Sequence, residues 1–284
     1  MKQTDSLPDK MFGAVVGDTV GSAYEWHNIK YKLAEEQMTV GNTHFTDDSV
    51  MTCAVAEGIM CGLRQLPDNW LAAGEEANTV IRREIIRSMK TFGRRFPNAG
   101  YGGSFFRWLL LPGSEPYNSW GNGSAMRVSF AGWAARSLEE AETLAELSAA
   151  VTHNHPEGIK GAKAVAGSIF TLRSGGGKED VRQYASQYYD LGFTLDEIRE
   201  EYTFDVSCQG SVPQAIVAFL TGESFTDVVA EAISIGGDSD TIAAIAGSMA
   251  EVIYPIPPAL KQRVADRLDD CLLQTLSEAA SFCE

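Results

Sequence analysis

Apolar residues recur at helical spacing along almost the whole chain, whereas the strict two-residue alternation of a half-buried strand is nearly absent. In the first such segment, Met11, Val15 and Val20 fall on one face of a helix. The same spacing recurs in the segments 50–60, 80–92, 126–135, 159–172, 212–220, 228–235, 242–253 and 260–276. A β-sheet is therefore difficult to build, and we expect an all-α fold of about a dozen short helices.

Prolines and glycines mark where several of these helices should begin. Pro156, Pro213 and Pro258 each stand near the start of a helical pattern, where the missing N–H of proline costs no hydrogen bond. Residues 67–69 should open another helix, with Gly74 as a weak point in its interior.

The chain has no linker rich in proline, serine or charge that would divide it into domains. Its 284 residues, of which 44% are hydrophobic, are enough for one large domain with its own core. The glycine run 174–177 is expected to be a helix end and a short loop. The longest irregular stretch is 96–124, and loops of this length tend to be functional. We therefore expect residues 1–284 to form a single compact domain.

The charge and the cysteines limit the class of protein. The chain has 23 basic and 38 acidic residues, and a net charge of −15 disfavours broad nucleic-acid binding and anionic lipid surfaces. No apolar run approaches the roughly 20 residues of a membrane span, and the start of the chain lacks the apolar core of a signal peptide. The five cysteines show no CxxC spacing, which predicts reduced thiols in a cytoplasmic protein. Zinc is disfavoured, because only His153 and His155 are close together and no cysteine pair accompanies them.

Two acidic clusters, 45–49 and 235–241, each come directly before an apolar helix. Together they offer four carboxylates and several hydroxyl oxygens, which are the hard ligands that Mg²⁺ or Mn²⁺ prefers. The candidate metal ligands are Thr46, Asp47, Asp48, Asp238, Asp240 and Thr241. Two divalent cations would balance the charge of the four carboxylates and leave Lewis acidity for a substrate oxygen.

Each cluster alone is typical of a helix N-cap, because Asp, Ser and Thr are common there. Adjacent carboxylates repel each other, however, and apolar positions that must be buried follow Asp48 and Asp240 closely. A helix dipole contributes only about 0.3–1 kcal/mol per charge, too little to hold paired carboxylates in a partly buried position. A bound cation does so more easily, so we predict that the two clusters converge on one metal site.

A glycine-containing segment, 119–124, precedes the helical pattern near Ala125. Closely spaced glycines before a helix expose backbone N–H groups, and a helix N-terminus favours a phosphate. Trp120 adds a face on which a base can stack. A plain turn with Trp120 packed inside the loop explains the same residues without a ligand, and the sequence leaves both interpretations open.

In order and content these motifs resemble those of the ADP-ribosylglycohydrolases, a family that includes dinitrogenase reductase-activating glycohydrolase and enzymes that remove ADP-ribose from modified protein side chains. The matching segments are 13–18 with Glu25, 46–48, 100–102, 121–127, 152–153 and 236–241. The resemblance implies a compact, single-domain orthogonal helical bundle. It also implies a binuclear centre of two Mg²⁺ or Mn²⁺ ions, bound by the six candidate ligands, three from each cluster.

The resemblance also assigns roles around the metals. Glu25 matches the family's catalytic glutamate, and His153 matches a position near the metals and the distal ribose. Asp18 is expected to brace the site or a helix, and Trp120 to stack on adenine. The residues expected to bind substrate, most of them around its diphosphate, are Ser119, Trp120, Gly121, Asn122, Gly123, Ser124, His153 and Gly102.

Some relatives carry an additional carboxylate in the region of residues 100–108, where this chain has none. This departure leaves the cleaved linkage open, while the intact acidic motifs argue for a working enzyme. We therefore predict hydrolysis at the anomeric carbon of the distal ribose, which releases ADP-ribose from a protein acceptor such as an arginine or serine side chain. Another two-metal phosphohydrolase and a non-catalytic ADP-ribose-binding protein are the alternatives, and the oligomeric state is open.

Overall fold

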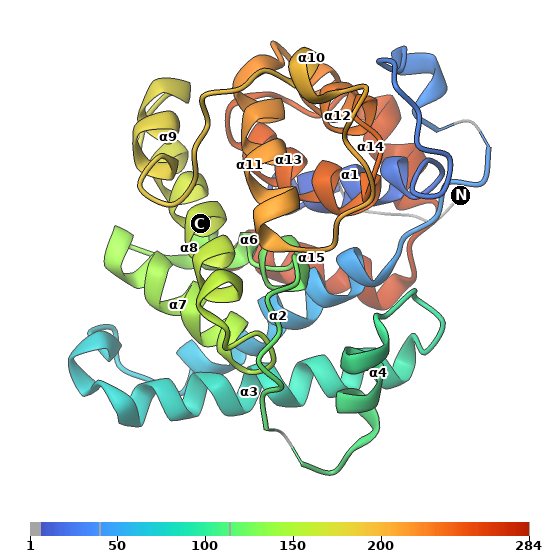
Figure 1. Cartoon of the computed structure of the whole chain (residues 1–284). Helices are drawn as coiled ribbons and strands as arrows, with labels where there is room; N and C mark the ends of the chain where they lie inside the picture. Colours follow the sequence, from blue (N-terminus) through green and yellow to red (C-terminus); the bar gives the residue numbers. More distant parts are fainter. Residues whose placement is uncertain (1–6, 40, 114, 284) are drawn as a thin grey trace.

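The computed structural model describes residues 7–39, 41–113 and 115–283, which form α-helices and two short 3₁₀ helices (Figure 1). The α-helices are α1 Gly13–Gly21, α2 Asp47–Leu63, α3 Glu75–Arg95, α4 Gly103–Leu110, α5 Gly123–Met126, α6 Ser129–Ala134, α7 Leu138–Ala150, α8 Pro156–Arg173, α9 Lys178–Ala185, α10 Leu195–Ile198, α11 Cys208–Thr221, α12 Phe225–Ser234, α13 Ser239–Ile253, α14 Pro258–Ala265 and α15 Asp270–Phe282. The 3₁₀ helices are η1 Glu35–Gln37 and η2 Trp70–Ala73. Within the described ranges there is no β-strand, so the all-α prediction is confirmed.

Helices α1 and α13 pack against each other near the centre of the molecule (Figure 1). Gly13, Gly17 and Gly21 recur every four residues on the face of α1 that meets α13. A Cβ atom built on Gly17 would collide with the Ala243 carbonyl, and one built on Gly21 would lie 2.5 Å from the Cα atom of Asp240. The glycines let the two backbones approach closely, and this places the end of α1 beside the start of α13.

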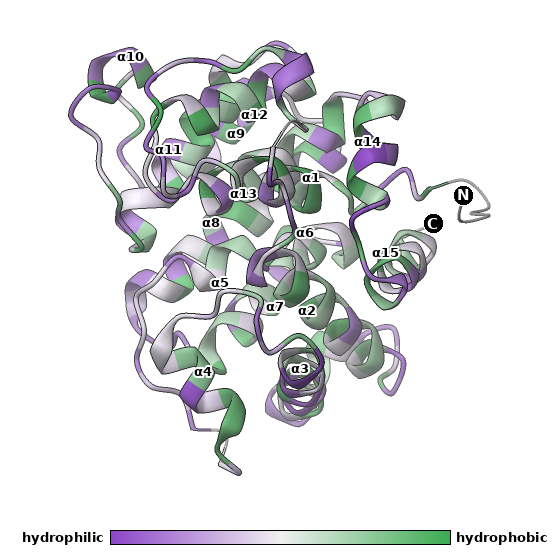
Figure 2. Cartoon of the chain, turned by 90° about the vertical axis from the view of Figure 1, so that its right-hand side faces the viewer, coloured by the Kyte–Doolittle hydropathy of each residue, from purple (hydrophilic) through white to green (hydrophobic). Residues whose placement is uncertain are grey.

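Helix α2 is buried along most of its length by α3, α15 and α1. Gly58 and Gly62 of α2 lie against Ile85 and Ile81 of α3, so this pair of helices also packs backbone close to backbone. Figure 2 shows mainly hydrophobic residues on α2 and many hydrophilic residues on α3 and on the connecting segments. Because its neighbours enclose α2, its N-terminus is fixed in the interior, next to the start of α13.

One predicted helix start and one predicted helix interior are wrong. Pro213 lies inside α11 rather than at its beginning, because Ser207, six residues earlier, caps the helix by accepting a hydrogen bond from the Gly210 N–H. Gly74 is not in a helix interior: its positive φ of 56° lets the chain turn between η2 and α3. The predictions for Pro156 and Pro258 are confirmed, since α8 and α14 begin at these residues.

Other segments are more finely divided than their periodicity suggests. The pattern over 126–135 includes the end of α5 and all of α6, and the pattern over 260–276 includes most of α14 and the first half of α15. Asp269 starts α15 by accepting a hydrogen bond from the Cys271 N–H. The irregular stretch 96–124 contains α4, and α7, α9 and α10 were not predicted, because they are short or rich in charged residues.

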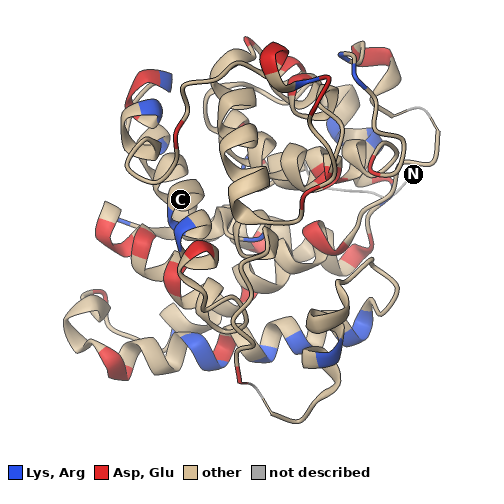
Figure 3. Ribbon diagram, viewed as in Figure 1, with Lys and Arg blue, Asp and Glu red and all other residues tan. Residues whose placement is uncertain are grey.

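The charged residues, the cysteines and the helix lengths can be compared with the expectations from composition. Figure 3 shows a row of Lys and Arg residues along α3, whereas Asp and Glu residues are spread over many of the other helices and connecting segments. The five cysteines are free thiols, as predicted. Among the described residues, no helix has the length and apolar character that a membrane span requires. Residues 1–6, which open the segment predicted to lack a signal peptide, lie outside the described residues.

Candidate metal centre and active site

Helices α2 and α13 begin next to each other, and each carries one acidic cluster in its first turn. Gly236 and Gly237 have φ angles of 70° and 72°, which turn the chain sharply into α13. Across the gap between the two helices, the Thr241 hydroxyl donates a hydrogen bond to Oδ2 of Asp48 over 3.3 Å. The predicted convergence of the two clusters is therefore confirmed.

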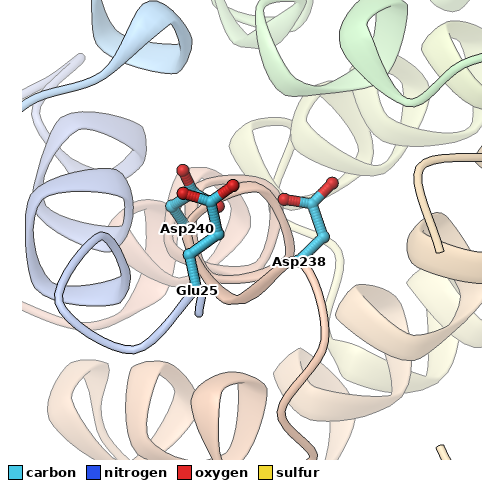
Figure 4. Close-up of side chains that lie close together, drawn as sticks. All are labelled: Glu25, Asp238 and Asp240. Atoms are coloured by element: carbon cyan, nitrogen blue, oxygen red, sulfur yellow. The ribbon is translucent and has the colours of Figure 1, made fainter. Parts of the chain in front are cut away.

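A further carboxylate, that of Glu25, joins the clusters from the segment that follows α1. Carboxylate oxygens of Glu25, Asp238 and Asp240 lie within 4.8 Å of one another (Figure 4). Asp47 and Asp48 line the same cavity from the start of α2. Five carboxyl groups from three separate segments thus share one small volume.

Burial raises the pKa of each of these carboxyl groups, and repulsion from neighbouring carboxylates raises it further. The pKa of Asp47 rises to about 8, that of Glu25 to about 7 and that of Asp238 to about 6. The pKa values of Asp48 and Asp240 are held well above the usual range. The carboxyl groups therefore resist ionising together unless positive charge is bound among them.

The available donor atoms fit a hard divalent cation. Oδ1 of Asp48 is buried without a hydrogen-bond partner, so an acceptor is free where a cation would need one. The residues of the two clusters that line the cavity offer carboxylate and hydroxyl oxygens, and none of the described lining residues of the cavity is a cysteine. Such a set suits Mg²⁺ or Mn²⁺ better than zinc.

Asp18 fixes the first turn of α2 from its place on α1. Its carboxylate accepts hydrogen bonds from the Thr46 N–H at 3.0 Å, the Thr46 hydroxyl at 2.7 Å and the Ser49 N–H at 3.0 Å, and also from the Ser49 hydroxyl. Burial raises the pKa of Asp18, and these donors oppose that rise. The prediction that Asp18 braces the site is confirmed, and the Thr46 hydroxyl is engaged with it.

The acidic residues line one end of a cavity of about 390 Å³, and the glycine segment lines another part of its wall. Asn122 joins the two parts, because its side-chain amide donates hydrogen bonds to Oδ2 of Asp238 at 2.6 Å and to the Ser211 hydroxyl at 2.9 Å. Its backbone N–H donates a hydrogen bond to the Val206 carbonyl at 2.7 Å. The glycine segment is therefore fixed relative to the carboxylates.

Comparisons with known proteins agree with these motifs. A family model described as ADP-ribosylglycohydrolase matches residues 6–282. The chain belongs to this family. The ADP-ribosylhydrolase ARH3 of Mus musculus is 27% identical over 85% of this chain and 82% of its own length, and that of Homo sapiens is 27% identical over 85% and 83%. A solved structure described as an ADP-ribosylglycohydrolase-related protein complex shares the fold, with a TM-score of 0.66, 19% identity and coverage of 96% of this chain and 94% of that one.

The cavity of this glycohydrolase contains most of the residues expected at the site. The expected residues that line it are Glu25, Asp47, Asp48, Gly102, Ser119, Gly121, Asn122, Gly123, His153, Asp238, Asp240 and Thr241. Thr46, Trp120 and Ser124 do not line it. Trp120 is 50% exposed outside the cavity, and the buried Ser124 hydroxyl donates to the Gly158 carbonyl at 2.7 Å. The helix expected after the glycine segment, α5, has only four residues, so its dipole adds little.

Several residues of the glycohydrolase cavity were missed by the sequence argument. Trp26 and Phe204 stack at its rim with ring centroids 5.3 Å apart, although they are separated by most of the chain. Tyr117 lies beside His153, and the buried Arg127 lines the inner wall. Trp26 directly follows Glu25 in the sequence, and that adjacency was the one signal that could have identified it.

Proposed function

We propose that the glycohydrolase cleaves the bond at the anomeric carbon of the distal ribose and releases ADP-ribose from a modified acceptor. The observation that carries this proposal is the meeting of both acidic clusters in one cavity whose wall also contains the glycine segment. The mouse and human relatives are named ADP-ribosylhydrolases, which supports the same reaction class. We propose a protein side chain, such as arginine or serine, as the acceptor.

In this proposal the acidic clusters hold two Mg²⁺ or Mn²⁺ ions. The proposed ligands are Thr46, Asp47, Asp48, Asp238, Asp240 and Thr241. When bound, such ions supply Lewis acidity for the ribose hydroxyls and for a water molecule. The chain orients its own carboxylates through the hydrogen bonds from Thr241 to Asp48 and from Asn122 to Asp238.

Glu25 is the proposed proton-transfer residue. In the cation-free chain its pKa is raised to about 7, first by burial and then by Asp240 and Asp18. A carboxyl group placed beside the acidic clusters can accept a proton from a reacting group or donate one to it. It lies with Asp238 and Asp240 at the acidic end of the cavity, where negative charge would stabilise an oxocarbenium-like transition state. The glycine segment would bind the diphosphate from the adjoining wall.

A panel of differently linked ADP-ribosyl substrates, assayed with Mg²⁺, with Mn²⁺ and with EDTA, tests this function. We expect cation-dependent release of ADP-ribose with its diphosphate intact from at least one linkage. Release of AMP or phosphate would instead indicate a two-metal phosphohydrolase. Tight ADP-ribose binding with no release from any substrate would indicate a binding protein.

The variant Glu25→Gln separates chemistry from binding. The amide keeps the size of the side chain but does not exchange protons, so we expect turnover to be lost and ADP-ribose binding to be retained. Glu36→Gln, an exposed glutamate in η1, is the matched control and should leave turnover unchanged. Undiminished turnover in Glu25→Gln would remove Glu25 from the chemistry.

A further inference from the structure

Arg127 is a fully buried arginine that lines the inner wall of the cavity, and the ion pairs of the described residues do not include it. Burial lowers its pKa to about 10, which still leaves the guanidinium charged at neutral pH. One of its nitrogens, Nη2, donates to the Ser148 carbonyl at 3.0 Å and to the Thr152 hydroxyl at 2.8 Å. A buried charge normally needs a strong partner, so this arrangement calls for an explanation.

The Thr152 hydroxyl connects Arg127 to His153. Its Oγ1 atom lies 2.7 Å from Nδ1 of the imidazole. A guanidinium only donates hydrogen bonds, and a hydroxyl has a single hydrogen. Because Oγ1 accepts from Arg127, its hydrogen is left for one of two neighbours, Nδ1 of His153 or the hydroxyl of Tyr117, which also forms a hydrogen bond with Thr152. We assign this hydrogen to the 2.7 Å contact with Nδ1, in which the Arg127 charge polarises the hydroxyl.

We propose that Arg127 and Thr152 are positioning residues that hold His153 in the neutral tautomer with a free Nε2–H donor. In this tautomer Nδ1 accepts from Thr152, so the single ring proton resides on Nε2. Burial and the nearby Arg127 charge both lower the His153 pKa far below its ordinary value, which keeps the ring uncharged.

The Nε2 atom is directed at the glycine segment. A Cβ atom built on Gly123 would lie 3.1 Å from Nε2, and one built on Gly121 would lie 3.5 Å from it. The glycines therefore leave room for the imidazole edge at the cavity wall, and no described residue accepts a hydrogen bond from Nε2. The donor is available to an oxygen of a ligand.

The ligand that fits is an oxygen-rich group, either an anionic oxygen or a hydroxyl, lying against the segment 121–123. The tautomer of His153 is argued independently of the proposed function. The identification of the ligand as the diphosphate-ribose part of the substrate rests on the proposed function. A neutral donor suits a site that also holds divalent cations, because it adds no positive charge near them.

Nitrogen-15 NMR of the histidine-labelled chain, without any ligand, tests the tautomer directly. The chain has only four histidines, and the variant His153→Gln assigns the signals of His153. We expect Nε2 in the protonated, pyrrole-like range and Nδ1 in the unprotonated, pyridine-like range. A protonated Nδ1 in the wild-type chain overturns the proposal, even if no variant folds.

Matched threonine variants test the positioning role. Thr152→Val removes the hydroxyl and should change the tautomer mixture and raise the Kd for ADP-ribose about tenfold, the loss expected for one hydrogen bond. Thr152→Ser keeps the hydroxyl and should restore both, while Thr275→Val, at another buried threonine, should change neither. An unchanged tautomer and an unchanged Kd in Thr152→Val contradict the proposal.

These results are separable from the proposed hydrolysis. If the panel of substrates shows no release of ADP-ribose while the NMR shows the Nε2–H tautomer, the proposed function fails and the positioning role stands. If ADP-ribose is released but Nδ1 is protonated, the proposed function stands and the positioning role fails.

Discussion

The Thr241 hydroxyl donates a hydrogen bond to Oδ2 of Asp48 over 3.3 Å, although 193 positions separate the two residues in the sequence. This contact joins the first turn of α13 to the first turn of α2, and each turn brings two carboxylates with it. Neither helix could hold such a pair in a buried position by its dipole alone. The contact therefore brings the four carboxylates of the two helix starts together into one candidate metal centre.

The variant Asp48→Asn should show both how much the buried carboxylate destabilises the cation-free chain and how much it contributes to cation binding. Without cation, we expect a higher Tm than in the wild type, because one buried and repelled carboxylate is gone. With Mg²⁺, we expect the cation-induced rise in Tm to disappear and the release of ADP-ribose to fall more than about 100-fold, the upper end of losses seen for residues behind a metal ligand. Differential scanning calorimetry with Mg²⁺ and with EDTA, together with the release assay, provides the measurements.

The control for this variant is Glu139→Gln, which removes an exposed acid from the first turn of α7. It should leave both the cation effect and the release unchanged. An Asp48→Asn protein that still gains wild-type stability from Mg²⁺ would show that Asp48 does not contribute to a cation site.

The stability of the cation-free chain should fall as pH rises. Asp47 and Asp238, with folded pKa values of about 8 and about 6, hold more protons in the folded than in the unfolded chain, where the pKa is about 3.8. The free energy of unfolding therefore decreases from about pH 4 to about pH 8. A divalent cation needs the ionised carboxylates, so its stabilising effect should grow over the same interval.

Thermal unfolding with Mg²⁺ and with EDTA, at about pH 5.5 and about pH 8, measures this effect. We expect the difference in Tm between the two additions to be larger at the higher pH. A difference that is equal at both pH values, or larger at the lower one, contradicts the assignment of these carboxyl groups to a cation site.

The sequence predicted the all-α fold and the meeting of the acidic clusters because both leave local signals. Helical spacing of apolar residues identifies a helix, and two carboxylates before a buried position require a counter-charge that single N-caps do not supply. The bracing role of Asp18 was expected from the family resemblance, and its hydrogen bonds with Thr46 and Ser49 agree with it. The roles of the individual site residues and the single-domain organisation stay predictions.

What the sequence could not supply depends on contacts between distant segments. The start of α11 was assigned to Pro213, because the competing cap at Ser207 leaves only a weak local signal. Trp120 was chosen for its position beside the glycines, yet the aromatic pair at the cavity rim, Trp26 and Phe204, comes from two segments that meet only in the folded chain. The hydrogen bonds of Arg127 are likewise invisible until α5, α7 and the following turn are packed together.

The variant Gly17→Ala should destabilise the protein and disturb the site from a distance. A Cβ atom at this position meets the backbone of α13 at Ala243, and backbone cannot rotate away as a side chain can. We expect a loss of about 1–3 kcal/mol in the free energy of unfolding, the usual cost of overpacking. Because α1 also sets the position of Glu25 relative to Asp240, the release of ADP-ribose should fall as well.

Gly177→Ala is the control, because a Cβ atom there has no neighbour nearer than the Asp180 carboxylate at 3.9 Å and the backbone φ is −108°. Chemical denaturation of both variants gives the comparison. Equal stabilities of the Gly17→Ala and Gly177→Ala proteins would show that the close approach of α1 and α13 is not required.

The carboxylate of Glu251 accepts hydrogen bonds at 2.9 Å from the N–H groups of Phe12 and Gly13 and so caps the start of α1 from α13. Burial raises its pKa to about 7, and the two N–H donors and Lys261 oppose that rise. The folded chain therefore binds this proton more tightly than the unfolded one, where the pKa is about 4.5. Its contribution to stability is complete below about pH 4.5 and is lost as the pH rises to about 7, a change on the order of 3 kcal/mol.

The variant Glu251→Gln keeps an oxygen acceptor for α1 but cannot titrate. We expect its free energy of unfolding to depend less on pH between about 4.5 and 7 than that of the wild type, whatever its absolute stability. The carboxyl groups of the candidate metal centre titrate in both proteins, so their effect cancels in the comparison, and Glu278→Gln on α15, an exposed glutamate, should keep the wild-type slope. Parallel pH profiles for Glu251→Gln and the wild type would mean that the buried cap of α1 is already ionised throughout this interval.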